Sequence, residues 1–251
     1  MGVGRYLLSL CLAGCVGVVD DAGDWPDAGA DAALAPPDAL GDAAPGVCPV
    51  DMRLVGDACM DRFEAPNVAG AKPLVMYTFL DAEAWCAARD KRLCFDDEWE
   101  EACGGAAKAD YVYGEPRVPG QCNDAMEWMP YSQAKLNGWP SGAAASDVES
   151  LDALLARARA AGGTVAADHV AELYQGAGSG NHAACVNEHQ VFDLTGNVEE
   201  WTRRRDGGVK DFHGNLKGRY WADTRTCGND ITSHGDLFRF YEIGFRCCQD
   251  R

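Results

Sequence analysis

Alternating apolar and polar positions mark the first predicted element, which covers Cys48–Asp61. Apolar residues recur at every second position on both sides of Gly56-Asp57, a dipeptide that is typical of tight turns. The pattern therefore predicts a β-hairpin. Cys48 and Cys59 would lie on its two strands and are plausible disulfide partners.

Two further stretches have the spacing of helices. The first begins at Thr78, whose hydroxyl forms a capping box with Asp81, and continues through Arg89. The second runs from about Asp96 to Cys103 and ends at Gly104-Gly105. Acidic residues in its first turn stabilise the positive end of the helix dipole.

A third helical pattern lies in what looks like an insertion over residues 143–180. Ser146 is expected to cap this helix at Glu149, and Gly162-Gly163 is expected to end it. Its apolar stripe has the spacing of one buried face and consists of Val148, Leu151, Leu154, Leu155 and Ala158. Such a stripe is more often a core contact than a groove for a partner, so we expect the insertion to pack on the rest of the domain.

The last third of the chain contains two strand-like segments, Leu216–Trp221 and Ile243–Cys248, separated by a stretch without periodicity. Short elements separated by long loops predict an irregular, loop-rich α+β fold. Residues 48–251 are enough for one well-buried core, so we expect a single domain.

The N-terminal 15 residues have the features of an export signal. The apolar run Tyr6–Ala13 is too short to span a bilayer, and Leu12-Ala13-Gly14-Cys15 resembles a bacterial lipobox, in which Cys15 carries the lipid. An ordinary secretory signal with a chance cysteine is the alternative. Residues 16–47 are rich in Asp, Ala and Pro and predict a disordered acidic tether. If Cys15 carries a lipid, we expect the protein to be anchored to a membrane of the cell envelope, on the periplasmic or the outer side.

The net charge and the cysteine content exclude some classes of function and predict disulfides. A net charge of −17 without a basic stripe argues against binding to nucleic acid. Of the 12 cysteines, Cys11 leaves with the signal and Cys15 carries lipid, so an even number remains and predicts disulfides in an exported domain. The sequence contains no pair of closely spaced cysteines with partner histidines, which is the pattern of a zinc site.

The segment Asp193–Trp201, with the sequence DLTGNVEEW, is the candidate metal site. Carboxylates lie at both ends of a tight Gly-Asn turn, and calcium prefers such carboxylate and carbonyl oxygens. Turn chemistry by itself also explains the glycine and the asparagine. The alternative is therefore a hairpin or loop anchored by a buried Trp201.

Four blocks in a fixed order resemble one known family. They are residues 73–105 (PLVMYTFLDAEAWCAARDKRLCFDDEWEEACGG), DLTGNVEEW, LKGRYW at 216–221 and IGFRCC at 243–248. From about Cys48 to Cys248 the chain resembles the formylglycine-generating enzymes, also called the sulfatase-modifying-factor domain. The resemblance implies an irregular α+β fold that is distantly similar to C-type lectins.

The same resemblance implies a structural calcium ion and a set of disulfides. The calcium ligands fall on the side chains of Asp193 and Glu200 and on the carbonyl oxygens of Gly196 and Val198. The implied disulfides are Cys86 with Cys247 and Cys103 with Cys227. For the four cysteines that then remain, we expect Cys94 to pair with Cys248 and Cys122 with Cys185.

The redox site of the family is where this sequence departs from the pattern. The family's enzymes oxidise a substrate cysteine with copper(I) held by two thiolates that follow a KGGS segment. The corresponding stretch here, Lys217–Cys227, contains one cysteine, and Cys227 aligns with a structural position. Tyr220 replaces the serine of KGGS, and Glu199 replaces a tryptophan. The ligand count therefore argues against copper.

Two functions remain, and no catalytic residue is assigned. The first is a non-catalytic module that binds a peptide or a glycan, because aromatic and Arg side chains suit recognition. Its predicted cleft consists of Trp201, Arg203, Tyr220, Trp221, His234 and Arg246. The alternative is an oxidoreductase of the formylglycine-generating type that oxidises cysteine with oxygen at a diverged metal site. The fold alone does not decide between them.

Overall fold

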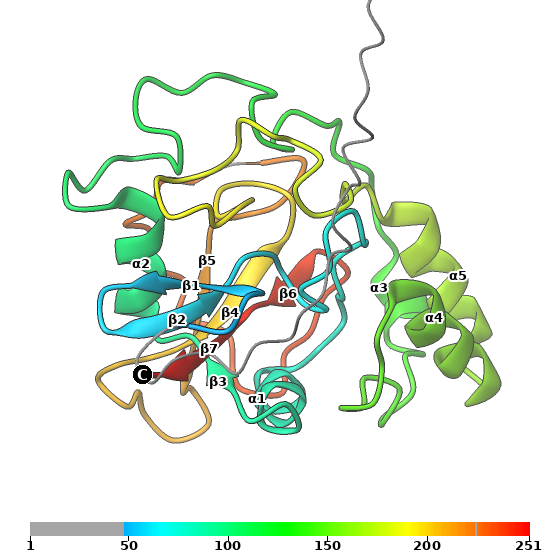
Figure 1. Cartoon of the computed structure of the whole chain (residues 1–251). Helices are drawn as coiled ribbons and strands as arrows, with labels where there is room; N and C mark the ends of the chain where they lie inside the picture. The colour runs from blue at the N-terminus through cyan, green and yellow to red at the C-terminus, as the bar shows by residue number, and fades with distance from the viewer. Residues whose placement is uncertain (1–47, 224) are drawn as a thin grey trace, which may run out of the picture. The chain divides into compact units, whose positions relative to one another are not determined.

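Two small β-sheets form the centre of the fold (Figure 1). The first sheet has the order β1-β2-β7-β3 and is antiparallel. The second has the order β5-β4-β6, in which β4 and β6 run parallel. The strands are β1 (Met52–Val55), β2 (Ala58–Asp61), β3 (Arg92–Leu93), β4 (Glu199–Arg203), β5 (Gly214–Lys217), β6 (Ile243–Phe245) and β7 (Cys247–Asp250).

This computed structural model describes residues 48–223 and 225–251. The predicted signal peptide, the predicted lipid site at Cys15 and the predicted tether over residues 16–47 lie outside that range. Within it, none of the helices is long and apolar enough to cross a membrane.

The predicted hairpin is confirmed. β1 and β2 pair in register around Gly56, whose positive φ of 53° makes the turn. A disulfide joins Cys48 to Cys59 as expected, although Cys48 lies before β1 and not on it.

The first two predicted helices are also confirmed. α1 (Phe79–Ala87) begins at Thr78, whose hydroxyl accepts from the Asp81 backbone N–H while the Asp81 carboxylate accepts from the Thr78 N–H. α2 spans Asp96–Gly104, and the Glu98 carboxylate accepts from the Phe95 N–H at 2.9 Å in front of its first turn. Both helices thus begin where local side chains satisfy free amides.

A helical lobe contains α3 (Gln133–Leu136), α4 (Leu151–Ala160) and α5 (Thr164–Leu173), which lie side by side in Figure 1. α4 and α5 lie within the predicted insertion, and α3 precedes it. The predicted stripe is buried, but the predicted cap is wrong. Ser150 caps α4 through the Ala153 N–H, whereas Ser146 lies in the preceding turn. The sequence pattern does not predict α5. The pair Gly162-Gly163 indicates only the end of α4, but Gly163 is also the N-cap of a new helix.

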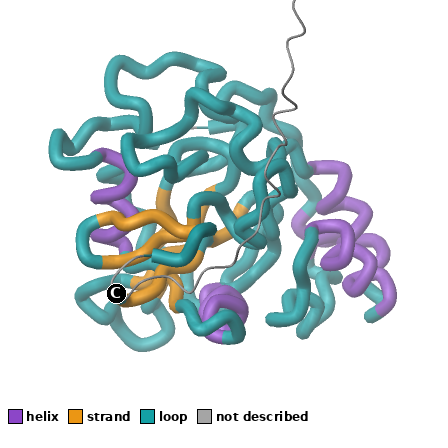
Figure 2. The backbone as a smooth tube through the Cα atoms, viewed as in Figure 1, coloured by secondary structure: helices purple, strands orange, loops and turns teal. Residues whose placement is uncertain are grey.

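The two strand-like C-terminal segments are shorter than predicted. β5 ends at Lys217, because Gly218 has a φ of 83° and turns the chain. The segment Ile243–Cys248 divides at Arg246 into β6 and β7, which belong to different sheets. Loops make up most of the described chain (Figure 2), so the prediction of an irregular, loop-rich α+β domain is confirmed.

Five disulfides cross-link the described chain, and four of them join segments that are distant in sequence. They are Cys48–Cys59, Cys86–Cys247, Cys94–Cys248, Cys103–Cys227 and Cys122–Cys185, which are the five pairs named in the sequence analysis. Two of them attach adjacent residues of β7 to α1 and to the residue after β3. α1 and the segment between β3 and α2 are therefore linked covalently to the C-terminal strand.

Candidate functional site

The loop Asp193–Trp201 folds as a tight turn that leads into β4. Gly196 and Asn197 have φ angles of 81° and 58°, in the left-handed region. A Cβ at Gly196 would lie 2.6 Å from the carbonyl oxygen of Asn123, so this position admits only glycine without a shift of the backbone. The Asn197 N–H donates to the same carbonyl at 2.7 Å, which fixes the loop against residue 123.

Beneath the loop lies a buried group of charges, here called the Glu200 cluster: Glu64, Asp193, Glu200 and Arg246. Arg246 donates to both carboxylate oxygens of Glu200, at 2.7 and 2.6 Å, and neither side chain is exposed. The indole N–H of Trp99 donates to the same carboxylate at 2.9 Å.

The other two carboxylates of the cluster are held by neutral donors. Asp193 Oδ2 accepts from the Gly180 N–H at 2.6 Å. Glu64 accepts from the Ser179 hydroxyl and from the Asn197 amide, each at 2.7 Å. Burial, followed by the negative charge of Asp193, raises the pKa of Glu64 to about 8, and burial raises the pKa of Asp193 to about 6.

The cluster contains three carboxylates and one guanidinium group, so its acidic groups outnumber its basic ones. Among the residues the structure describes, no three His, Cys, Asp or Glu side chains converge as metal ligands. The predicted calcium site would use only two such side chains, those of Asp193 and Glu200, together with the carbonyl oxygens of Gly196 and Val198. It stays a prediction.

Four of the six predicted binding residues are buried, which corrects the predicted cleft: Trp201, Tyr220, Trp221 and Arg246. Trp201 and Arg246 are both 0% exposed. Trp201 lies on β4, the central strand of its sheet, and donates to the carbonyl oxygen of Tyr77 at 3.1 Å. Arg246 lies at the break between β6 and β7 and is satisfied by Glu200. Neither side chain can touch a surface ligand without unfolding of the sheet around it.

Arg203 lies apart from the other predicted residues. It is the last residue of β4, is exposed, and pairs with Glu83 at 2.7 Å. It lines a shallow groove of about 390 Å³ beside α1, together with Leu80 and Arg92.

The remaining three residues are connected by aromatic rings. Tyr220 contacts Trp221, and Trp221 contacts Tyr241, with ring centroids 5.8 and 6.1 Å apart. From Tyr241 the contacts continue through a set here called the aromatic row, which ends at His234 and consists of Tyr131, His234, Phe238, Phe240 and Tyr241. The row therefore brings Tyr220, Trp221 and His234 to one part of the domain.

Sequence reasoning missed Tyr131, Phe238, Phe240 and Tyr241. The segment 226–240 lacks strand or helix periodicity, so its pattern predicts only a loop. The signal that could have identified the row is composition, since residues 238–241 read Phe-Arg-Phe-Tyr. Aromatic residues grouped in a loop indicate a core contact or a recognition surface.

Two buried acids lie beside the aromatic row, and together they are called the acid pair: Glu199 and Glu242. The Glu199 N–H donates to the Glu242 carbonyl oxygen at 2.9 Å. Burial and the charge of Glu242 raise the pKa of both Tyr220 and Tyr241, so this carboxylate lies near both phenols. Burial also raises the pKa of Glu199 to about 7 and that of Glu242 to about 8.

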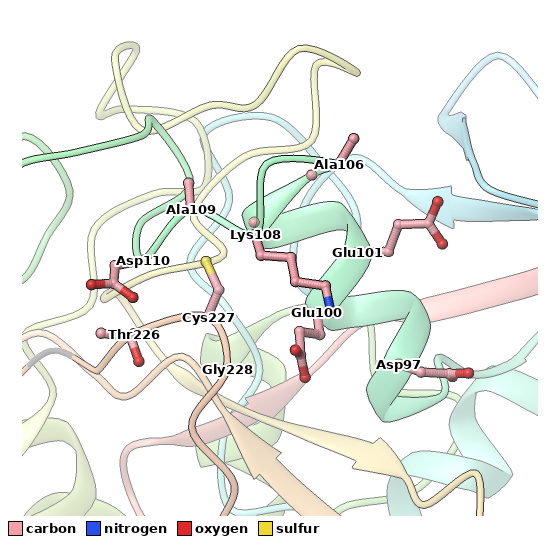
Figure 3. Close-up of a pocket in the computed structure, with 12 residues that line it drawn as sticks. Asp97, Glu100, Glu101, Ala106, Lys108, Ala109, Asp110, Thr226, Cys227 and Gly228 are labelled. Carbon is pink, nitrogen blue, oxygen red and sulfur yellow. The ribbon is translucent and has the colours of Figure 1, made fainter.

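A separate pocket of about 600 Å³ opens beside α2 (Figure 3). Asp97, Glu100 and Glu101 line it from the helix, Asp110 lies on the opposite side, and Cys227 forms part of its wall. Glu100 is an ion-pair partner of the buried Lys217, at 3.4 Å. The pocket is acidic and open to solvent.

Comparison with known proteins decides the family. A family-level match to the sulfatase-modifying factor enzyme 1-like domain covers residues 25–251. The chain belongs to this family. A curated relative, the inactive Cα-formylglycine-generating enzyme 2 of Bos taurus, is 28% identical over 188 residues, which are 70% of this chain and 49% of the relative. The chain thus spans about half the length of that protein.

Solved structures that are similar to this chain include that of PvdO from Pseudomonas aeruginosa and that of CarF. Each is 13% identical to this chain with a TM-score of 0.46, and each alignment covers 77% of the chain. It covers 86% of CarF and 80% of PvdO. In this sulfatase-modifying-factor domain, all ten cysteines of the described range are paired in disulfides.

Proposed function

We propose that this sulfatase-modifying-factor domain is a non-catalytic module that binds a peptide or a glycan at the cell envelope. The observation that carries the proposal is the state of the cysteines. Each cysteine from Cys48 to Cys248 is bonded to another in a disulfide. A soft ion such as copper(I) requires thiolates, and the described chain offers none.

The scaffold around the missing thiolates is complete. The disulfides, the Glu200 cluster and the two sheets remain, and Tyr220 and Glu199 occupy positions where the resembling enzymes carry other residues. A domain that keeps its fold and loses its redox ligands is free to serve as a recognition surface. The bovine relative, which is named as an inactive enzyme, agrees with this reading.

The aromatic row and its neighbours supply a surface for binding. Tyr131 is 43% exposed and Trp128 is 52% exposed, on the loop that precedes the helical lobe. Tyr131 packs edge-on against Phe240 with ring centroids 4.9 Å apart. Rigid aromatic side chains offer contact area at a small entropic cost, as recognition surfaces require.

A structural calcium ion is part of this proposal. Asp193 and Glu200, with the carbonyl oxygens of Gly196 and Val198, would hold it. The ion would neutralise the excess negative charge of the Glu200 cluster and would tie the loop before β4 to the core. Its contribution is to the stability of the fold.

The proposed location is the cell envelope, with Cys15 as the lipid anchor. Five disulfides are typical of a protein that folds in an oxidising compartment. Lipid on Cys15 would anchor the protein to a membrane. The acidic tether would then separate the folded domain from the membrane surface.

The decisive experiment incubates the purified chain with copper(I), oxygen and cysteine-containing peptides, and detects aldehyde by hydrazide labelling and mass spectrometry. An active formylglycine-generating enzyme is the positive control. We expect no aldehyde above background and no free thiols in the described domain by alkylation and mass spectrometry. Aldehyde formation would establish the alternative, an oxidoreductase that acts on cysteine with oxygen.

A further inference from the structure

The pocket beside α2 is large and its walls are fixed (Figure 3). Its volume of about 600 Å³ is that of a small-molecule site. The Ala109 N–H donates to the Gly104 carbonyl oxygen, and the Cys227 N–H donates to the Asp110 carbonyl oxygen, each at 2.8 Å. The disulfide Cys103–Cys227 joins the end of α2 to the other wall. The pocket is therefore preformed by the fold.

Carboxylates line this pocket from two sides. Glu100 extends from α2, and Asp110 lies on the opposite side (Figure 3). Glu100 Oε1 is turned towards Gly228, since a Cβ built on that glycine would lie 3.8 Å from it. Asp97 lines the pocket from the same helix but is already paired with Arg205 at 2.9 Å. Glu100 and Asp110 are thus the two acids that face a ligand.

The neighbouring cations leave the pocket negative. Lys217 lies 3.4 Å from Glu100 but 2.7 Å from Asp230, which is its closer partner. Lys108 lines the pocket but forms no ion pair within residues 48–223 and 225–251, and neither does Glu101, a further acid of the lining. The last turn of α2 contains no basic residue, so the negative end of the helix adds to the attraction for a cation.

The arrangement of the acids selects the kind of cation. Glu100 and Asp110 lie on opposite sides, and in the described part of the chain no three His, Cys, Asp or Glu side chains converge to hold a metal ion. Small residues line the pocket as well, among them Gly104, Ala106 and Ala109. Aliphatic stems cover apolar surface of this kind while their charged ends bind carboxylates. A ligand with an ammonium group at each end of a methylene chain matches both features.

We propose that the pocket beside α2 binds an aliphatic diamine or polyamine, with one ammonium group against Glu100 and another against Asp110. The methylene chain then lies over the small residues between them. No residue of the aromatic row lines this pocket, so the inference goes beyond the proposed function and adds a second site. The net charge of −17 raises the local concentration of such a cation.

The first test titrates cadaverine into the purified full chain by isothermal titration calorimetry at about 150 mM salt. Pentylamine and pentanediol have the same stem with one charge and with none. We expect the diamine to bind about fivefold or more tightly than the monoamine, because only the diamine reaches both carboxylates. The diol should not bind. Equal binding of diamine and monoamine would overturn the proposal.

The same titration separates a free diamine from the side chain of a protein partner. Nα-acetyl-lysine methylamide presents a single ammonium group on the same stem, and we expect it to bind as weakly as pentylamine. Binding as tight as that of cadaverine would assign the pocket to a partner's lysine and overturn the two-charge site. Displacement of cadaverine by an equal concentration of calcium would assign the pocket to a metal ion.

Two variants should change the affinity for cadaverine in opposite directions. Asp110→Asn should weaken binding by about fivefold or more, because it removes one of the two anchoring charges. Lys108→Met should strengthen binding, because it removes a competing cation from the pocket. The matched controls are Asp152→Asn on α4 and Lys135→Met on α3, which make the same charge changes at exposed positions outside the lining. Both should bind within about twofold of the unaltered chain.

The controls decide whether the site or the net charge attracts the ligand. Equal losses in Asp110→Asn and Asp152→Asn would show attraction by net charge alone and would overturn the proposal. Unchanged affinity in Asp110→Asn, or weaker binding in Lys108→Met, would also contradict it. All of these positions are exposed, so thermal unfolding should show folded variants. The aldehyde assay reports on catalysis alone, so a failure of the non-catalytic function is recognised separately.

Discussion

Arg246 and Glu200 face each other through two hydrogen bonds of 2.6 and 2.7 Å, with both side chains fully buried. The guanidinium lies at the break between β6 and β7, and the carboxylate lies on β4, so the pair joins the two sheets. A buried pair of this kind is costly to break, because removal of one partner leaves the other charged and without water.

We therefore expect Arg246→Met to destabilise the domain by about 3–5 kcal/mol. The double variant Arg246→Met/Glu200→Gln should be less destabilised than the single one, since no buried charge is then left unpaired. Urea unfolding measures both. Arg203→Met is the control on the same sheet, and it should cost less than about 1 kcal/mol because its pair with Glu83 is exposed. Equal costs for the two single variants would refute the role of burial.

Calcium should raise the unfolding temperature of the chain, and a chelator should lower it. At a calcium concentration 100-fold above the dissociation constant, the gain is about 2.7 kcal/mol. Asp193→Asn should remove most of this increment, whereas Asp152→Asn on the exposed face of α4 should keep it. Differential scanning fluorimetry with and without calcium gives the result. An increment that survives in Asp193→Asn, or that magnesium reproduces in full, would contradict the site.

Asp61 gives a prediction for pH. Its carboxylate is buried and pairs with Lys91 at 2.6 Å. Burial, opposed by Lys91, raises the pKa of Asp61 from 3.8 to about 6. The folded state then binds more protons than the unfolded state between these values, so this group's contribution to stability falls as the pH rises from about 4 to about 6.

Asp61→Asn removes that titration, and the stability deficit of the variant should therefore shrink as the pH rises across this window, by about 1–3 kcal/mol. Asp51→Asn is a matched control, because Asp51 pairs with the same lysine from a more exposed position. Its deficit should vary less. Urea titrations at pH 4, 5, 6 and 7 provide the comparison. A deficit for Asp61→Asn that grows with pH would show that attraction to Lys91 outweighs burial.

The five disulfides should differ in their effect on stability. Cys48–Cys59 closes a loop with a sequence separation of 11 residues, and Cys86–Cys247 one of 161. Loop-closure entropy then predicts that replacing the longer-range pair by alanine costs about 2 kcal/mol more than replacing the hairpin pair. Thermal unfolding of the two double variants tests this order. The reverse order would show that packing at the hairpin outweighs chain entropy.

Cys15→Ser should release the protein from the membrane if the lipobox is used. Expression in a bacterial host, cell fractionation and mass spectrometry of the N-terminal peptide provide the readout. The unaltered chain should carry an acylated Cys15 in the membrane fraction, and the variant should lose it. Membrane association of the variant, or an unmodified N-terminal peptide in the unaltered chain, would favour an ordinary secretory signal.

The sequence by itself determined the local elements of this protein. The hairpin turn at Gly56, the capping box of Thr78 and Asp81, and the glycine stop of α2 are set by residues within a few positions of one another, so local patterns predict them. The order of motif blocks determined the family and implied the disulfides Cys86–Cys247 and Cys103–Cys227. The pattern predicts Ser146 as the cap of α4, but two serines lie near the start of this helix, and the cap is Ser150.

Only the tertiary structure decided which side chains are accessible. Trp201 and Arg246 look like recognition residues in the sequence, but the central position of β4 and the division of Ile243–Cys248 between two sheets bury both. The aromatic row joins Tyr131 to residues more than a hundred positions later. Burial and non-local contacts depend on how separate segments pack. The hydrophobic effect is non-directional, so the sequence pattern of one segment does not show which other segment it packs against.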